Sequence, residues 1–152
     1  ETLRQNPATL ARTGHAVAFQ LPALPEAASR AFDWRLPKTI MRRTAMAGSF
    51  DRADFDRYTA AWEREGAFTA MLNWYRANAR SPPATADATR VPTRIVWGRE
   101  DSFLPTGMAH DSLDRCRDGR LSTLDATHWL HHDVPVKVGD AIVDELGGPE
   151  RS

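Results

Sequence analysis

Residues that could do chemistry lie in two segments of the second half of the sequence, TRIVWGREDSFLP (93–105) and DATHWLHHDVP (125–135). In the first, an apolar run ends at Gly98 and Asp101 follows in the loop. In the second, His128 follows the next predicted strand by a few residues. The carboxyl ends of neighbouring parallel strands share one sheet edge, so this order would bring the carboxylate and the imidazole together. The carboxylate could then fix the imidazole tautomer and stabilise its charged form.

Each of these residues also has a plainer explanation, because a loop aspartate often caps a turn and a lone histidine is often structural. A metal site is an alternative, since histidines three and four residues apart can share a helix face. Its ligands would be His128, His131, His132 and Asp133. His131 and His132 lie where a helix is about to start, so we expect no metal and no other cofactor. Cys116 is the only cysteine and lacks any motif around it, which predicts an incidental thiol.

The elements that would position this pair alternate between strand and helix. We expect strands at Val91–Trp97 and Arg120–Leu124, with a helix at Gly107–Arg117 between them. Asp133 and Pro135 would open a last helix as its cap and first-turn residues. Val138, Ile142 and Leu146 would line the inner face of that helix, and Gly147–Gly148 would end it. This alternation of strand and helix predicts an α/β fold with a parallel sheet, and such a sheet needs more strands than these two.

The first half of the sequence is mostly helical in pattern, and Ser81–Arg90 is a linker rich in proline and small residues. Helices are predicted at Leu3–Thr13, Ala27–Trp34 and Lys38–Met46, and Phe19–Pro25 should be extended. Asp51 can cap a helix with one aromatic face, and the helix of about Gly66–Ala79 has a second apolar stripe. These faces consist of Phe55, Tyr58 and Trp62, and of Phe68, Leu72 and Tyr75. We therefore predict a helical lid at 1–84 and core structure at 85–152.

Four motifs together resemble a known family. VPTRIVWGREDSFLP and THWLHHDVP are similar to the C-terminal signature of α/β-hydrolases of the epoxide hydrolase and haloalkane dehalogenase branch. AFQLPALPE (Ala18–Glu26) and LNWYRA (Leu72–Ala77) resemble lid motifs of epoxide hydrolases, and the likeness spans about residues 1–147. The resemblance implies a partial α/β-hydrolase fold, with a helical lid followed by the last two strand–helix units of the parallel sheet.

The same resemblance implies a mechanism, in which an aspartate attacks an epoxide and a histidine–acid pair hydrolyses the resulting alkyl-enzyme ester. Asp101 and His128 match that pair, and Tyr75 matches a lid tyrosine that donates a proton to the epoxide oxygen. Such a donor is needed because negative charge develops on that oxygen as the ring opens and must be stabilised. Phe19, Trp74 and Trp129, together with Phe68, would line a pocket for a small apolar substrate, although core packing explains these aromatics equally well.

The sequence departs from the family pattern in two ways. Ala18 stands where a second lid tyrosine is expected. Either the second proton donor is missing, or another group such as His15 takes that role. No glycine-flanked nucleophile elbow is found, and Ser49 has no strand before it, so we expect this chain alone to be inactive. The alternatives are a haloalkane or haloacid dehalogenase, a serine ester hydrolase, or a non-catalytic interaction module.

Composition sets the remaining expectations. Lysine plus arginine and aspartate plus glutamate number 20 each, for a formal net charge of zero, which argues against nucleic acid as a partner. The apolar runs are short, so we expect no membrane insertion. The open sheet and lid predict a homodimer or association with a missing N-terminal half. The single cysteine and the lack of a signal-peptide pattern predict a cytoplasmic protein, although the true N-terminus is not seen.

Overall fold

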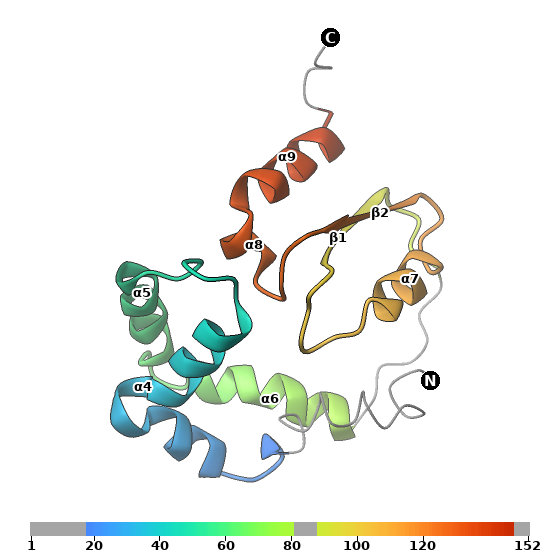
Figure 1. Cartoon of the computed structure of the whole chain (residues 1–152). Helices are drawn as coiled ribbons and strands as arrows, with labels where there is room; N and C mark the ends of the chain where they lie inside the picture. Colours follow the sequence, from blue (N-terminus) through green and yellow to red (C-terminus); the bar gives the residue numbers. More distant parts are fainter. Residues whose placement is uncertain (1–17, 81–87, 148–152) are drawn as a thin grey trace. The chain divides into compact units, whose positions relative to one another are not determined.

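The computed structural model describes residues 18–80 and 88–147, which form two compact units. The first unit contains residues 18–43 and 50–80, and the second contains residues 44–49 and 88–147. Helices and strands carry the labels of Figure 1. The helix predicted at Leu3–Thr13, the residue His15 and most of the predicted linker lie outside the described residues.

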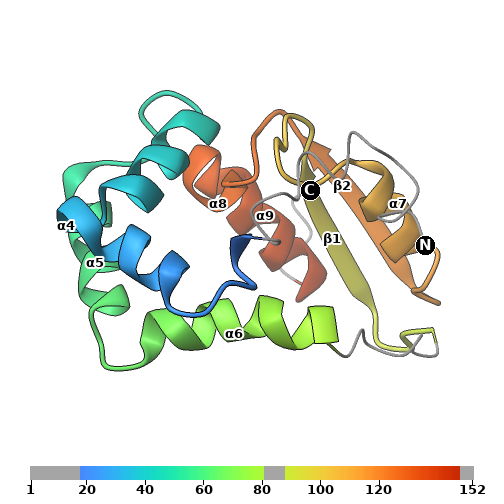
Figure 2. The same cartoon turned by 90° about the horizontal axis from the view of Figure 1, so that it is seen from below.

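The first unit is helical, with α4 (Leu24–Thr44, whose last residue groups with the second unit), α5 (Arg52–Trp62) and α6 (Ala67–Arg80) (Figures 1 and 2). A capping box starts α5: Asp51 accepts from the Asp54 N–H at 2.8 Å, and the Asp54 carboxylate accepts from the Asp51 N–H at 3.0 Å. This confirms the predicted cap.

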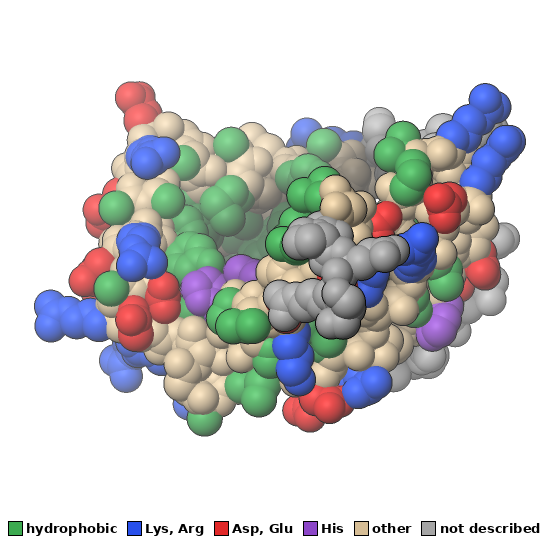
Figure 3. Space-filling model, turned by 90° about the horizontal axis from the view of Figure 1, so that it is seen from above, with side chains coloured by type: hydrophobic (Ala, Val, Ile, Leu, Met, Phe, Trp, Pro, Cys, Tyr) green, Lys and Arg blue, Asp and Glu red, His purple; other side chains and the backbone are tan. Residues whose placement is uncertain are grey.

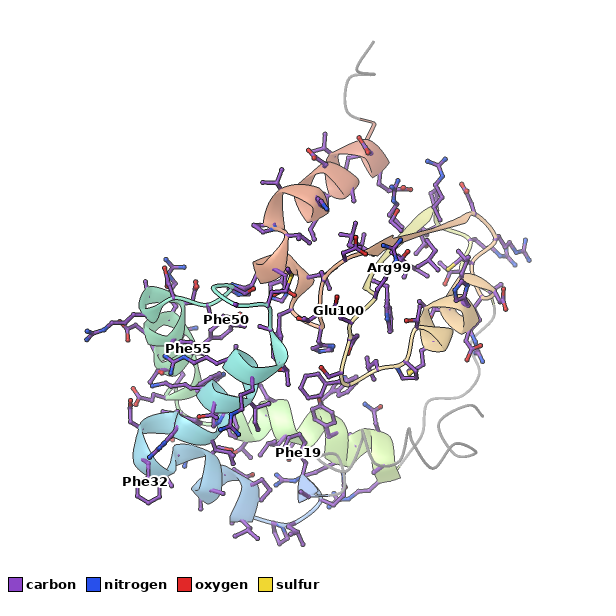
Figure 4. The ribbon with its side chains drawn as sticks, viewed as in Figure 1. Phe19, Phe32, Phe50, Phe55, Arg99 and Glu100 are labelled. Carbon is purple, nitrogen blue, oxygen red and sulfur yellow. The ribbon has the colours of Figure 1, made fainter. Side chains whose placement is uncertain are left out.

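Each helix of the first unit contributes one ring to a buried aromatic cluster. The ring centroid of Trp34 lies 5.4 Å from that of Trp62 and 4.9 Å from that of Phe68. Trp62 and Phe68 are 6.3 Å apart, and Leu72 packs nearby with 3% of its surface exposed. On α5, Phe55 is buried as well and lies beside Phe50, which Figure 4 labels next to it. Four of the six residues predicted from helical spacing, Phe55, Trp62, Phe68 and Leu72, are therefore in the core of this unit, while Tyr58 and Tyr75 are half-buried.

Helix α4 consists of two helical segments joined by a kink, in keeping with the prediction of two short helices. The kink lies at Ala31–Trp34, inside the first predicted helix, and Phe32, Asp33 and Trp34 have φ values of 53°, 56° and 57° there. This left-handed turn sends Phe32 outward with 86% of its surface exposed, as Figure 4 shows, while Trp34 enters the core.

The predicted extended segment Phe19–Pro25 is wrong. Residues 19–23 form turns and bends, Ala23 has a φ of 60°, and α4 begins at Leu24. Pro25 is tolerated because it falls in the first helical turn, where its missing N–H has no intrahelical partner to lose.

The second unit is built on a parallel strand pair. Strand β1 (Thr93–Gly98) pairs with β2 (Gly119–Leu124) in a register that runs from Thr93↔Gly119 to Gly98↔Leu124. Helix α7 (Gly107–Leu113) connects the two strands and packs on β2, and the short α8 (Leu130–Asp133) follows β2. Helix α9 (Pro135–Glu145) packs on β1, and Figure 1 shows α7 and α9 on opposite sides of the strand pair.

Three local predictions for this unit are wrong. Asp133 does not cap α9, whose N-cap is Val134 without a side-chain hydrogen bond; Asp133 instead ends α8. Ile142 and Leu146 are 54% and 81% exposed, and α9 buries Ala141, because two strands offer too narrow a surface to cover a whole helix face. Helix α7 ends at Leu113, since Cys116 instead forms a β-bridge with Thr89.

Charged side chains of both signs are interspersed over the face shown in Figure 3, in keeping with the balanced composition. None of the described helices combines the length and the apolar character that crossing a membrane requires.

Candidate active site

Asp101 and His128 form a hydrogen-bonded pair in the second unit. The Nδ1 atom of His128 lies 2.8 Å from Oδ2 of Asp101. Because β1 and β2 are parallel and in register, their carboxyl ends meet at one edge of the sheet. Asp101 follows β1 through a tight turn that begins with Arg99 and Glu100, labelled in Figure 4, and His128 follows β2. The structure therefore brings these two predicted residues together.

The Asp101 carboxylate is buried and fully engaged. Its side chain is 7% exposed, and Oδ1 accepts hydrogen bonds from the N–H groups of Phe103 at 2.8 Å and Leu104 at 2.9 Å. Burial alone would raise the pKa of this carboxyl, but the hydrogen bond to His128 and the two backbone N–H donors outweigh it, so the pKa is lowered. Asp101 thus stays ionised and can orient the imidazole.

The His128 side chain remains partly accessible, with 36% of it exposed. Aromatic rings flank it: the Phe103 centroid lies 5.0 Å away and the Trp129 centroid 5.3 Å away, both edge-on. Since Nδ1 donates to Asp101, Nε2 is the nitrogen left to accept a proton. A histidine held in this way can act as a general base toward water.

Asp133 organises the turn that carries His128, a role that the sequence did not reveal. Its Oδ2 accepts from the N–H of Thr127 at 2.8 Å and from the hydroxyl of the same residue at 2.6 Å. Its Oδ1 accepts from the Ser49 hydroxyl at 2.5 Å and the Met46 N–H at 3.2 Å. Burial raises the pKa of Asp133, but these four donors outweigh it and lower the pKa. Ser49 is therefore a donor to Asp133, on a segment without strand structure.

The structure does not bring the side chains of the alternative metal site together as ligands. The Asp133 carboxylate is occupied by four hydrogen-bond donors, and the rings of His131 and His132 pack on each other at 4.7 Å. Among residues 18–80 and 88–147, no group of three or more histidine, cysteine, aspartate or glutamate side chains could hold a metal ion.

The first unit brings together the predicted lid residues Phe19, Trp74 and Tyr75. The Tyr75 ring lies 5.1 Å from the Phe19 ring and also 5.1 Å from the Trp74 ring, edge-on in both cases. Trp74 is 66% exposed, whereas Phe19 and Tyr75 are half-buried. The structure thus groups three predicted site residues in the first unit and three, Asp101, His128 and Trp129, in the second.

Arg76, the last residue of the NWYR motif, holds the turn that carries Phe19. Its guanidinium donates to the Phe19 carbonyl at 2.9 Å and the Leu21 carbonyl at 3.0 Å. It also makes a two-pronged ion pair with Glu26, at 2.8 and 3.1 Å, and bonds Asn73 at 3.0 Å. The hydrogen bond from Arg76 lowers the pKa of Glu26. Sequence reasoning missed this role of Arg76, for which the available signal was a charged residue at the end of the NWYR motif.

The chain shares its architecture with solved epoxide hydrolases. An epoxide hydrolase from Bacillus megaterium, solved in complex with an inhibitor, matches with a TM-score of 0.77 at 19% identity, over 95% of this chain and 54% of that one. An AB hydrolase superfamily protein of Bacillus subtilis is 36% identical over 137 residues, which cover 89% of this chain. The chain belongs to the α/β-hydrolase superfamily.

Epoxide hydrolase 2 of Caenorhabditis elegans is 33% identical over 125 residues, covering 77% of this chain, which places the chain in the epoxide hydrolase branch of the superfamily. The matched part amounts to 48% of the Bacillus subtilis relative and 35% of the Caenorhabditis elegans one, so this α/β-hydrolase chain spans half or less of their length. No protein-family model matches the sequence. The partial α/β-hydrolase fold expected from the sequence motifs is confirmed by the structural likeness.

Proposed function

We propose that this chain supplies the lid and the acid–base pair of a hydrolase that opens epoxides through an alkyl-enzyme ester. The observation that carries the proposal is the Asp101–His128 pair at the carboxyl end of two parallel strands, with Nε2 free to act and Phe103 and Trp129 flanking the ring. The names of the relatives agree with this substrate class.

In the proposed reaction a carboxylate attacks one epoxide carbon, and the carbon–oxygen bond breaks as the ester bond forms. Tyr75 gives its phenolic proton to the departing oxygen, because an unprotonated alkoxide is a poor leaving group. His128 then removes a proton from water, the resulting hydroxide attacks the ester carbonyl, and the bond between that carbonyl carbon and the alkyl oxygen breaks. The leaving alkoxide takes the proton of the imidazolium to give the diol, and the proton of the restored carboxylic acid returns to the Tyr75 phenolate. Asp101 holds the imidazole in its tautomer and stabilises the imidazolium that forms.

The attacking carboxylate is proposed to come from residues outside this sequence of 152 residues, because no nucleophile elbow occurs within it. Ser49 is unsuited to the role, since its hydroxyl donates to Asp133 and no strand precedes it. We therefore expect the isolated chain to lack turnover.

The test uses the protein encoded by the complete reading frame that contains this chain, incubated with an aryl epoxide. With His128→Gln, attack still occurs but water is not activated, so the alkyl-enzyme ester should accumulate and appear by mass spectrometry as one added substrate mass. The wild type should instead release diol. His110→Gln, which changes an exposed histidine on α7, is the matched control and should behave as wild type. If neither diol nor adduct forms with any epoxide, the proposal is wrong.

Dehalogenation is the second candidate, and Ala18 is the observation that favours it. A halide leaves without a proton, so the chemistry does not need the second tyrosine that the motif resemblance places at this position. Turnover of a chloroalkane or bromoalkane with halide release, and none of an epoxide, would establish this alternative. The His128→Gln protein would trap an alkyl ester in that case too.

A further inference from the structure

The backbone on both sides of His128 is held by a network separate from the Asp101 pair. Thr127 precedes the histidine and is buried, with 7% of its surface exposed. Its N–H and hydroxyl both donate to Oδ2 of Asp133, and its hydroxyl oxygen accepts from the N–H of Trp129 at 3.2 Å. Asp133 therefore fixes the residue before the histidine directly, and the residue after it through a single hydroxyl.

The other oxygen of the same carboxylate is bound to a distant segment, Thr44–Ser49, which joins α4 to α5 in sequence yet belongs to the second unit. Oδ1 of Asp133 accepts from Ser49 and Met46, 84 and 87 residues away in the chain. The Nε1 of Trp129 donates to the Thr44 hydroxyl at 2.9 Å, which ties the histidine turn to the same segment. The turn is thus braced by three side-chain bonds to Thr44–Ser49.

We propose that Asp133 is a positioning residue for His128, holding the turn of Thr127–Trp129 against Thr44–Ser49 so that Nε2 keeps the direction needed to activate water. The inference rests on the proposed function for the role of His128. Asp133 does not reach the imidazole itself, so its effect passes through Thr127. Small displacements of a general base are costly, since an error of about 1 Å can reduce a rate on the order of 100-fold.

Asp133→Asn is a sharp probe because each carboxylate oxygen accepts one backbone N–H as well as one hydroxyl. Whichever way the amide turns, its NH₂ group must face the N–H of Thr127 or that of Met46. A hydroxyl could rotate to accept from the amide, but a backbone N–H cannot. The substitution keeps size and shape and removes one acceptor in a network whose donors are fixed.

The experiment follows single turnovers of an epoxide by the protein of the complete reading frame. We expect Asp133→Asn to slow hydrolysis of the ester on the order of 10–100-fold while its formation stays near the wild-type rate. Ser49→Ala, which removes one donor of four, should slow the same step less. Asp144→Asn and Ser112→Ala, at exposed positions of α9 and α7, are the matched controls and should leave both steps unchanged.

A second readout does not depend on turnover. The Nδ1–H proton of His128, hydrogen-bonded to Asp101, should give a downfield NMR resonance that broadens or shifts in Asp133→Asn and keeps its position in Asp144→Asn. If the wild type forms no ester, the proposed function fails while this comparison still tests Asp133. An unchanged resonance, or an equal loss in both chemical steps, would overturn the positioning role. Should Asp133→Asn not fold, the same two readouts on Ser49→Ala decide the question.

Discussion

A Cβ atom placed on Gly98 would lie 2.2 Å from the carbonyl oxygen of Thr127. The last residue of β1 therefore touches the backbone immediately before His128. The next carbonyl oxygen, that of Ala126, would be 2.5 Å from the same Cβ atom, and it also accepts the Glu100 N–H at 3.0 Å. Because Gly98 has no side chain, the loop that carries Asp101 and the loop that carries His128 can approach each other closely.

Gly98→Ala should accordingly displace the histidine turn. Because the clash is with backbone, which cannot rotate away, we expect a loss of about 1–3 kcal/mol in the free energy of unfolding. We expect a loss on the order of 10–100-fold in the rate of ester hydrolysis. Gly107→Ala is the matched control, since a Cβ atom there meets nothing within 4 Å. Denaturant unfolding and single-turnover kinetics of both variants measure the difference; equal stability of the two would contradict the steric argument.

Trp34→Ala should destabilise the first unit strongly. Trp34 is 3% exposed and packs on Trp62 and Phe68, so removing its indole leaves a cavity at the meeting point of three helices. The expected loss is about 3–5 kcal/mol in the free energy of unfolding. Trp74→Ala removes the same side chain from a position that is 66% exposed and should cost about 0.5 kcal/mol or less. Urea titration measures the unfolding free energy of each variant, and a similar loss in Trp34→Ala and Trp74→Ala would contradict the assignment of Trp34 to the core.

Arg76→Ala should loosen the turn that carries Phe19, because one guanidinium holds two carbonyls of that turn and Glu26. We expect a lower melting temperature and faster amide hydrogen exchange over residues 19–24. Arg76→Lys should restore little, since an ammonium cannot reproduce the planar fork. Arg57→Ala removes an exposed partner of Asp54 and serves as the control. Unchanged exchange at 19–24 in Arg76→Ala would show that other contacts hold the turn.

Acid should weaken the second unit through Asp101 and Asp133. The pKa of each is lowered from an ordinary value of 3.8 in the folded chain, so the unfolded chain binds protons more readily. Their contribution to stability is present above about pH 4 and is lost as the pH falls through their folded-state pKa values. The difference in unfolding free energy between wild type and Asp133→Asn should therefore shrink as the pH falls below about 4. A difference that grows with acid would reverse the sign and contradict the assignment.

The sequence predicted the structure correctly where the interacting residues lie close together in the chain. The cap at Asp51 involves a residue three positions away, and the aromatic stripe of α5 follows from helical period, so both could be read from the sequence. The Asp101–His128 pair was also predictable, because strand order and chain order place both residues at one sheet edge. The left-handed turn at Phe32–Trp34 was not, since no glycine marks it.

Asp133 shows why the rest could not be read in the same way. An aspartate two residues before a proline has the local pattern of a helix cap, and that was the prediction. Its actual donors include Ser49 and Met46, more than 80 residues away, and nothing in the local pattern points to them. Likewise, periodicity marked Ile142 and Leu146 as inward-facing, but two strands alone leave them exposed.

The division of the chain at Thr44–Ser49 has a consequence for protein engineering. These six residues interrupt the helical unit in sequence but group with the strand-containing unit, where they supply both donors to one oxygen of Asp133. A chimera that imports a foreign helical unit as one continuous block would replace them and leave that oxygen without its partners. Grafting residues 18–43 and 50–80 as two separate segments, with the native hexapeptide kept between them, should keep the histidine turn intact.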